Sequence, residues 1–207
     1  MEKFFINEHS IYGFDLDGTL YDEFEFIYQT YKGISQFISD ITERDFTEIH
    51  EEISRLWLTY GSSRTDLFQM FFSIYSIEPK TEYIKKCIEI YRTEEFKLKL
   101  PMRTTMVLSE LKKRKIPFFL LTDGDSSLQR RKIKALGLDM FILEENIFIS
   151  GDYGKEYQKP NTLVNEFIRK RFHNMKDVIY FGDRDVDEQY ARNSEFSFQR
   201  VKCMIPF

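Results

Sequence analysis

The sequence has few of the features that mark disulfide-linked, membrane or nucleic-acid-binding proteins. Only two cysteines, Cys87 and Cys203, occur among 207 residues, and their separation matches neither a zinc site nor a redox pair, so a disulfide framework is excluded. No run of about 18 apolar residues is present, so no segment is predicted to span a bilayer. The first 14 residues contain polar and acidic interruptions and do not resemble a signal peptide. We therefore expect a cytoplasmic chain with reduced thiols.

The sequence also lacks a basic excess and is nearly without alanine. Its formal net charge is −4, which offers nothing to hold nucleic acid or an anionic membrane, and we expect neither partner. Two alanines stand against 21 phenylalanines and 12 tyrosines, so aromatic side chains are predicted to fill the core. Apolar residues make up 42% and charged residues 31%, a composition typical of a folded domain. The length fits one large domain or one domain with an insertion.

One block of the chain, residues 22–92, has helical periodicity throughout. Apolar residues recur three and four positions apart in four sets, which begin at Phe24, Phe46, Leu67 and Ile84. Breaks separate these sets near residue 40, at residues 61–63 and at residues 78–79. The block is therefore predicted to form about four helices and no strand.

Short apolar runs alternate with helical segments outside this block. Strands are predicted at the start of residues 11–20 and over residues 117–122, 147–150, 178–182 and 196–201. Helices are predicted over residues 102–115, 126–136, 162–172 and 186–193. This alternation indicates parallel pairing through helical crossovers. We expect an α/β core with a doubly wound, mainly parallel sheet, formed by residues 1–20 and 100–207, and an inserted helical domain formed by residues 21–99.

Two polar motifs lie where predicted strands end, which is where open α/β sheets bind ligands. In DLDGT, residues 15–19, alternation along the strand points Asp15 and Asp17 to the same side. Such a pair could act as nucleophile and general acid, although a polar strand end before a glycine turn has the same pattern. In TDG, residues 122–124, the Thr122 hydroxyl and the following N–H groups could bind an oxyanion or simply cap a helix.

Two further polar motifs follow later in the chain. Lys159 precedes Pro160, and the proline would fix the loop and direct the lysine inward, whereas a lone loop lysine is usually solvated. Asp183, Asp185 and Asp187 follow a predicted buried strand. Carboxylates this close repel one another unless a cation is bound, so a hard metal ion is their natural partner. A capped helix start would account for the same residues.

Together, in this order and spacing, the four motifs resemble those of the haloacid dehalogenase superfamily of phosphohydrolases. The resemblance is carried by DLDGTL at residues 15–20, Thr122, Lys159 with Pro160, and GDRDVD at residues 182–187, and it extends over residues 11–201. It implies a Rossmann-like catalytic core and makes the helical block the family's cap, inserted between the first and second motifs. It also implies Mg²⁺ as the cofactor.

The resemblance assigns roles to the catalytic and phosphate-binding residues. Asp15 would be the nucleophile that becomes an aspartyl phosphate, and Asp17 would protonate the leaving alkoxide and then deprotonate water. Thr122, Asp123 and Lys159 form the expected phosphate-binding group. Many family members have asparagine where Asp123 stands, and an extra anion beside a phosphate is costly. We therefore expect the Asp123 carboxylate to point away or to pair with a lysine or arginine.

The resemblance also implies a metal site. Its ligands would be Asp15, the backbone carbonyl of Asp17 and Asp183, with Asp187 as a ligand through water or as a support behind the site. Asp185 lies inside the same motif and competes with Asp187 for that role.

These assignments predict a Mg²⁺-dependent phosphohydrolase for a small phosphomonoester such as a sugar phosphate, phosphoglycolate or a nucleotide monophosphate. The alternatives are a phosphotransferase of the mutase kind, which would need a sugar bisphosphate activator, and a non-catalytic binding module. Asp17 disfavours haloalkanoate dehalogenation and phosphonate cleavage, because those relatives lack this carboxylate.

Several basic residues outside the motifs have a structural and a functional interpretation. Arg64, in a loop between two predicted cap helices, could contact a substrate anion or be a surface arginine. Basic clusters at residues 112–115, 130–134 and 169–171 lie on or beside predicted helices. Because the net charge is negative, we interpret them as solvated helix faces.

Overall fold

The computed structural model describes residues 7–62, 64, 66–173 and 177–206. The chain forms two compact units, one from Met1–Glu23 with Leu98–Phe207 and one from Phe24–Lys97. From the sequence we placed the boundaries at residues 20/21 and 99/100, a few positions away.

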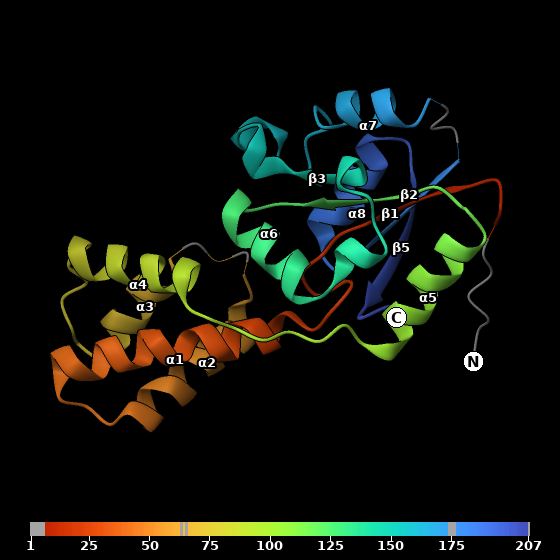
Figure 1. The fold of residues 1–207 in the computed structure, drawn as a ribbon. Coiled ribbons are helices and arrows are strands. Elements are labelled where there is room, and N and C mark those ends of the chain that lie inside the picture. The colour runs from red at the N-terminus through yellow and green to blue at the C-terminus, as the bar shows by residue number, and fades with distance from the viewer. Residues whose placement is uncertain (1–6, 63, 65, 174–176, 207) are drawn as a thin grey trace. The chain divides into compact units, whose positions relative to one another are not determined.

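The first unit is built around a sheet with the strand order β3-β2-β1-β4-β5-β6 (Figure 1). Its strands are β1 (Ile11–Phe14), β2 (Phe118–Thr122), β3 (Ile147–Ile149), β4 (Val178–Gly182), β5 (Ser197–Lys202) and β6 (Ile205–Pro206). Neighbours from β3 to β5 pair in parallel, and β6 pairs antiparallel to β5. The five parallel strands confirm the predicted sheet; the pattern did not predict β6, which has only two residues.

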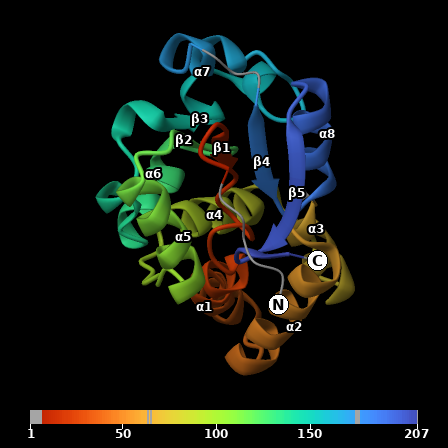
Figure 2. The same cartoon turned by 90° about the vertical axis from the view of Figure 1, so that its right-hand side faces the viewer.

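Helices cover both faces of this sheet. They are α5 (Met102–Lys113), α6 (Ser126–Ala135), α7 (Asn165–Arg171) and α8 (Asp185–Asn193). In Figure 2, α5 and α6 lie on one face and α7 and α8 on the other. Short 3-10 helices occupy Leu138–Met140, Glu144–Asn146, Ser150–Asp152 and Lys155–Tyr157. The predicted doubly wound α/β core is therefore confirmed, although α7 begins three residues later than we predicted.

The strands form because their apolar runs can be buried on both faces. All five residues of β2 are buried, as are all four of β1, the pattern of central parallel strands. A core cluster joins the sheet to α7 and α8, and it includes Phe119, Leu121, Ile168, Tyr180 and Tyr190. Aromatic side chains thus fill core volume that smaller apolar side chains fill in other proteins.

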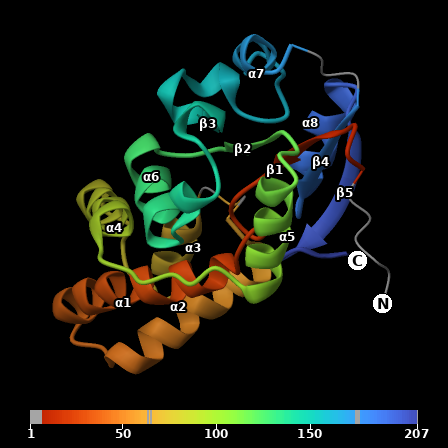
Figure 3. The ribbon, with the colours of Figure 1, turned by 45° about the vertical axis from the view of Figure 1, so that its right-hand side comes forward.

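The second unit contains four α-helices among its described residues (Figure 3). They are α1 (Glu23–Thr42, beginning one residue before the unit), α2 (Phe46–Tyr60), α3 (Leu67–Ile74) and α4 (Thr81–Thr93). Aromatic ring contacts join α1 to each of the others, through Phe24–Trp57, Tyr31–Phe68 and Phe37–Tyr83. The predicted four-helix insertion and its aromatic core are confirmed. Within the described residues, every helix is too short or too polar to cross a bilayer.

Candidate active site

The candidate site lies at the carboxyl ends of three neighbouring strands. Asp15 directly follows β1, Thr122 ends β2, and Asp183 directly follows β4. Because β1 lies between β2 and β4, the strand order reverses direction at β1. Open α/β sheets form a ligand-binding crevice at such a switch point. The topology therefore brings the Asp15 motif beside two motifs that lie more than a hundred residues later in the sequence.

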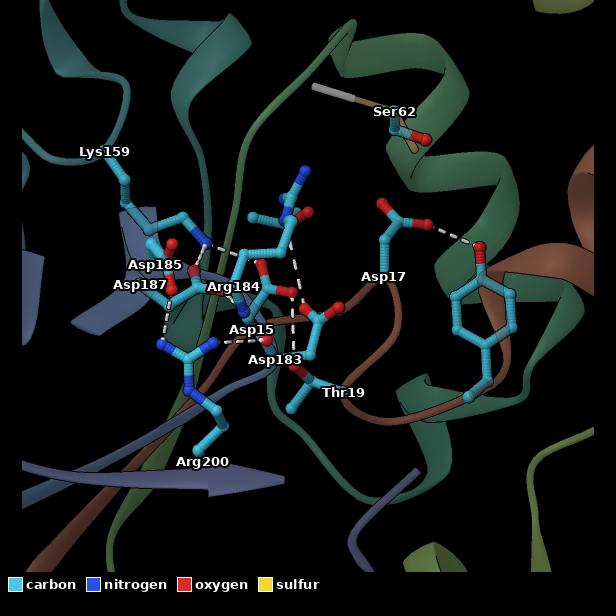
Figure 4. Close-up of polar contacts among 12 residues, drawn as sticks. Asp15, Asp17, Thr19, Ser62, Lys159, Asp183, Arg184, Asp185, Asp187 and Arg200 are labelled. Atoms are coloured by element: carbon cyan, nitrogen blue, oxygen red, sulfur yellow. Dashed lines mark hydrogen bonds and ion pairs between the residues drawn. The ribbon is translucent and has the colours of Figure 1, made fainter. Parts of the chain in front are cut away.

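A buried lysine joins two of the motif carboxylates. Lys159 Nζ donates to Asp15 Oδ1 at 2.6 Å and to Asp187 Oδ1 at 2.6 Å (Figure 4). A weaker contact of 3.3 Å joins Lys159 Nζ to the Tyr180 hydroxyl. The side chains of Lys159 and Asp187 are 0% exposed and that of Asp15 is 1% exposed. The lysine therefore lies inside the site rather than on its rim.

Burial shifts the proton affinities of this group. It raises the pKa of Asp15 to about 8, and the Lys159 ammonium offsets this only in part. Burial alone would lower the pKa of Lys159, but Asp15 and Asp187 outweigh it and hold that pKa well above its usual value. Asp15 thus needs more positive charge than Lys159 supplies if it is to be fully ionised at neutral pH.

Three carboxylates have the arrangement of a cation site. One oxygen from each of Asp15, Asp183 and Asp187 lies within 4.8 Å of the others. Asp183 Oδ1 is buried without a hydrogen-bond partner, and burial raises the pKa of Asp183 to about 6. A buried carboxylate oxygen without a donor is costly. Oxygen ligands of this number and charge suit Mg²⁺, so the residues fit the ion that the family resemblance implies.

Asp187 supports this group from behind. Its Oδ1 accepts from Lys159, and its Oδ2 accepts from the backbone N–H of Arg184 at 3.1 Å. Both oxygens of Asp187 are thus engaged, and so are those of Asp15, which accept from Lys159 and, at 3.4 Å, from the Thr19 hydroxyl. Asp183 has the oxygen without a hydrogen-bond partner, and direct ligation by Asp15 stays what the family resemblance implies. Asp185 points elsewhere: its side chain is 96% exposed and pairs with Arg200 at 2.7 Å. Between the two alternatives that the sequence left open, the geometry favours Asp187.

The absence of a side chain at Gly18 leaves space for the Asp183 carboxylate. Its φ of +78° is a conformation that other residues adopt only with strain. A side chain there would collide with the Asp183 carboxylate. The glycine of the first motif therefore serves both the turn and the close approach of Asp183.

Asp17 has surroundings quite different from those of Asp15. Its Oδ1 accepts from Lys132 Nζ at 2.7 Å and from the Tyr21 hydroxyl at 2.5 Å. Its Oδ2 accepts from Gln129 Nε2 at 2.8 Å. Burial acts to raise the pKa of Asp17, but Lys132 and the two other donors bring that pKa below its usual value. Each carboxylate of the first motif thus contacts a buried lysine, but their pKa values are shifted in opposite directions.

Gln129 also orients Thr122. Its Nε2 donates to Thr122 Oγ1 at 2.6 Å, so the threonine oxygen acts as an acceptor. Its own hydroxyl proton remains for another acceptor. Thr122 is buried, and its phosphate-binding role stays a prediction.

Asp123 holds the loop of Lys159. Its two carboxylate oxygens accept from the backbone N–H of Lys159 at 3.3 and 3.2 Å. We expected this carboxylate to point away or to pair with a lysine or arginine side chain, and it instead bonds to a lysine's backbone. The contact positions the loop, so we do not retain the Asp123 side chain as a phosphate ligand.

Arg64 lies in the other compact unit. Its guanidinium makes two hydrogen bonds to Asp66, at 2.7 and 3.1 Å, and lies over the Tyr60 ring. These contacts are those of a surface arginine.

Comparisons with known proteins show the family of the chain. A family model described as haloacid dehalogenase-like hydrolase matches residues 12–201. The chain belongs to this family. No curated protein matches it.

Solved structures of haloacid dehalogenase-like proteins share the fold. A candidate beta-phosphoglucomutase from Thermotoga maritima is 19% identical, with a TM-score of 0.68 over 93% of this chain and 85% of that one. A subfamily IA, variant 1 hydrolase of the superfamily from Geobacter sulfurreducens is 17% identical, with a TM-score of 0.69 over 96% and 90%. A family hydrolase from Deinococcus radiodurans, with bound phosphate and sodium, is 16% identical, with a TM-score of 0.62 over 91% and 79%.

Sequence reasoning missed three residues of this haloacid dehalogenase-like site. Lys132 belongs to a basic cluster that we interpreted as a solvated helix face, and that interpretation is wrong for Lys132, which is buried against Asp17. Gln129, three positions earlier on α6, is buried as well. Their spacing alongside the apolar Leu128 and Ile133 is the signal that could have revealed them. Arg184 lies within the fourth motif and was given no role.

Proposed function

We propose that this chain is a Mg²⁺-dependent phosphohydrolase that cleaves a small phosphomonoester through a phosphorylated Asp15. The contrast between the two first-motif carboxylates carries the proposal: Asp15 lies with Lys159 and the acidic group, whereas Asp17 is bound by Lys132, Gln129 and Tyr21. Covalent transfer needs two carboxylates with separate tasks, and different environments give them separate tasks.

The first step is attack by an Asp15 carboxylate oxygen on phosphorus. The new oxygen–phosphorus bond forms as the bond to the substrate alkoxide breaks. The alkoxide takes its proton from Asp17, which Lys132 holds ionised at rest and which must therefore be protonated in the reacting complex. In the second step Asp17 takes a proton from water, whose oxygen attacks the acyl phosphate. Inorganic phosphate leaves and the Asp15 carboxylate is restored.

Charge repulsion is the main obstacle to the first step, because an anion must approach a phosphate dianion. Lys159 is placed to reduce it, since its ammonium already contacts Asp15. Thr122 would donate its hydroxyl proton to a phosphoryl oxygen. Mg²⁺ held by Asp15, Asp183 and the Asp17 backbone carbonyl would neutralise phosphoryl charge and orient the group for in-line transfer.

A phosphotransferase of the mutase kind is the alternative, and it is favoured by one observation: the name of the structurally similar protein from Thermotoga maritima. A mutase would return the phosphoryl group from Asp15 to a second hydroxyl instead of to water. It would therefore depend on a sugar bisphosphate, whereas a phosphohydrolase would not.

The test is phosphate release from a panel of sugar phosphates, nucleoside monophosphates and phosphoglycolate, with Mg²⁺ or with excess chelator. We expect Mg²⁺-dependent release from at least one member without any bisphosphate activator. The matched control is Asp15→Asn, which should be inactive on all of them. Isomerisation that appears only with a sugar bisphosphate would favour the mutase, and no turnover in either assay would contradict both.

We also propose that the protein acts in the cytoplasm. Cys87 is a buried free thiol, which supports a reducing, cytoplasmic location. The partner would be a small phosphorylated metabolite.

A further inference from the structure

Arg184 is a charged residue of the site to which the motif assignments give no task. It lies between Asp183 and the start of α8, and its backbone N–H donates to Asp187. Its side-chain Nε is buried and has no hydrogen-bond partner. The nearest carboxylate oxygen, Asp183 Oδ1, is 3.9 Å away, which is too far for a hydrogen bond.

The rest of the guanidinium is partly open. The Arg184 side chain is 29% exposed, and within the described part of the chain it makes no side-chain hydrogen bond. Arg200, only 16 positions later, contrasts with it, since Arg200 bonds Asp185, Glu188 and a backbone carbonyl. Among the described residues, Arg184 thus has only a long ion pair with Asp183. A buried guanidinium donor without a hydrogen bond is unfavourable, so its donors are available to an anion.

The location of Arg184 indicates which anion its guanidinium would bind. In Figure 4 its side chain lies between Lys159 and Asp17, next to Asp15 and Asp183. Its electrostatic neighbours include Asp15, Asp187, Glu23 and Asp183. The guanidinium is therefore beside the carboxylate that would receive the phosphoryl group.

The net charge of the site also favours binding of a phosphate beside Arg184. Asp15, Asp183, Asp187 and Glu23 carry four negative charges, and Lys159 and Arg184 carry two positive ones. A bound divalent cation would bring the sum to about zero, whereas without Arg184 it would be about −1. A phosphomonoester dianion binds better to the less negative site.

We propose that Arg184 binds the non-bridging oxygens of the transferring phosphoryl group, as a substrate-contacting cation in addition to Lys159. The planar guanidinium offers paired N–H donors whose spacing matches two phosphate oxygens. The inference rests on the proposed phosphohydrolase function and adds a residue to its phosphate site.

Inorganic phosphate is the probe that tests this directly. Calorimetric titration of phosphate into the Mg²⁺-loaded protein compares the parent with Arg184→Met and Arg184→Lys. We expect Arg184→Met to weaken phosphate binding by at least about tenfold, because charge-assisted hydrogen bonds are lost, and Arg184→Lys to recover part of it. Arg192→Met is the matched control: Arg192 is on α8, its side chain is 78% exposed, and its loss should leave phosphate affinity within about twofold.

Titration of Mg²⁺ alone separates phosphate binding from damage to the metal site. Arg184→Met should bind Mg²⁺ at least as well as the parent, because a positive charge beside the carboxylates has been removed. Unchanged phosphate affinity in Arg184→Met, or a parallel loss of Mg²⁺ and phosphate binding, would overturn the proposal. A parent protein that binds phosphate but cleaves no phosphoester would contradict the proposed function alone, because the role of Arg184 would still be read from the binding constants.

Discussion

Lys132 Nζ lies 2.7 Å from Asp17 Oδ1, and the two side chains are 3% and 10% exposed. The pair joins the loop after β1 to the last turn of α6. Removing one partner of a buried ion pair leaves an uncompensated charge, which typically costs about 3–5 kcal/mol. The first motif therefore depends on a residue of α6 that lies outside all four motifs.

We predict that Lys132→Met lowers the free energy of unfolding by about 3 kcal/mol. Adding Asp17→Asn should restore part of that loss, because the unpaired carboxylate is then neutral. Urea unfolding of both single variants and the double variant gives the coupling energy. Lys134→Met, on the exposed side of the same helix, is the control and should change stability by less than about 0.5 kcal/mol. Strictly additive effects would show that the pair is not energetically coupled.

The sheet was predictable because its strands are unusual in composition. Short apolar runs such as Phe118–Thr122 favour central strands of a covered sheet, and their alternation with helices indicates parallel pairing. The last strand pair was not predictable, since Ile205–Pro206 is too short to have a periodicity. The predicted first residues of helices were less accurate than the predicted strands: α7 begins at Asn165, later than the pattern indicated.

The motif residues could be found from the sequence because strand ends place them, but their partners could not. Charge alone cannot tell the buried Lys132 from its exposed neighbour Lys134, and only the helical spacing of Lys132 from Leu128 separates the two. Nor could it decide between Asp185 and Asp187, whose exposure is opposite in the structure. Those choices depend on which side of a helix faces Asp15 and Asp17, and only packing determines this.

Lys159→Met should affect both activity and stability. Turnover should fall by at least about a hundredfold, because a preorganised charge on the transferring group is worth a few kcal/mol. The buried ammonium also separates Asp15 from Asp187, so the metal-free variant should have a lower melting temperature at pH 8. Steady-state kinetics with Mg²⁺ and thermal unfolding in chelator measure the two effects. Near-normal turnover would remove Lys159 from the phosphate site.

Metal removal should abolish activity. Excess chelator should leave no measurable turnover, and Mg²⁺ should restore it. Ca²⁺ should inhibit, because it takes more ligands at longer distances than Mg²⁺ and would disturb the in-line geometry. Activity is followed as phosphate release at fixed ionic strength, with Na⁺ as the control ion. Full activity in chelator would contradict a metal-dependent mechanism.

The raised pKa of Asp183 should make the stability of the metal-free protein depend on pH. Burial raises the pKa of Asp183 from 3.8 to about 6, so the folded state binds its proton more tightly than the unfolded state. This contribution is fully present below about pH 4 and is lost as the pH rises through about 6; two pKa units correspond to about 3 kcal/mol.

Asp183→Asn should remove that penalty. In chelator, the variant should melt at least about 5 °C above the parent at pH 8 and show no such advantage near pH 4. Added Mg²⁺ should stabilise the parent and not the variant, since the variant lacks a ligand carboxylate. Melting curves that stay parallel from pH 4 to pH 8 would show that Asp183 titrates normally.

The two first-motif carboxylates can be separated with a substrate whose leaving group needs no proton. With p-nitrophenyl phosphate and Mg²⁺, Asp17→Asn keeps the nucleophile, so attack by Asp15 can release nitrophenolate. Hydrolysis of the resulting acyl phosphate is then slow, because its water has lost the base. Asp17→Asn should therefore give a burst of about one nitrophenolate per site, followed by a slow steady state.

Asp15→Asn should give neither phase, since no phosphoenzyme can form. The parent should also cleave p-nitrophenyl phosphate faster than an alkyl phosphate of similar size, because Lys132 keeps the pKa of Asp17 low and the resting acid is ionised. Stopped-flow absorbance resolves the burst, and mass spectrometry of quenched Asp17→Asn should find the phosphoryl group on Asp15. A burst in Asp15→Asn and none in Asp17→Asn would reverse the two roles, because the phosphoryl group would then have been accepted by Asp17.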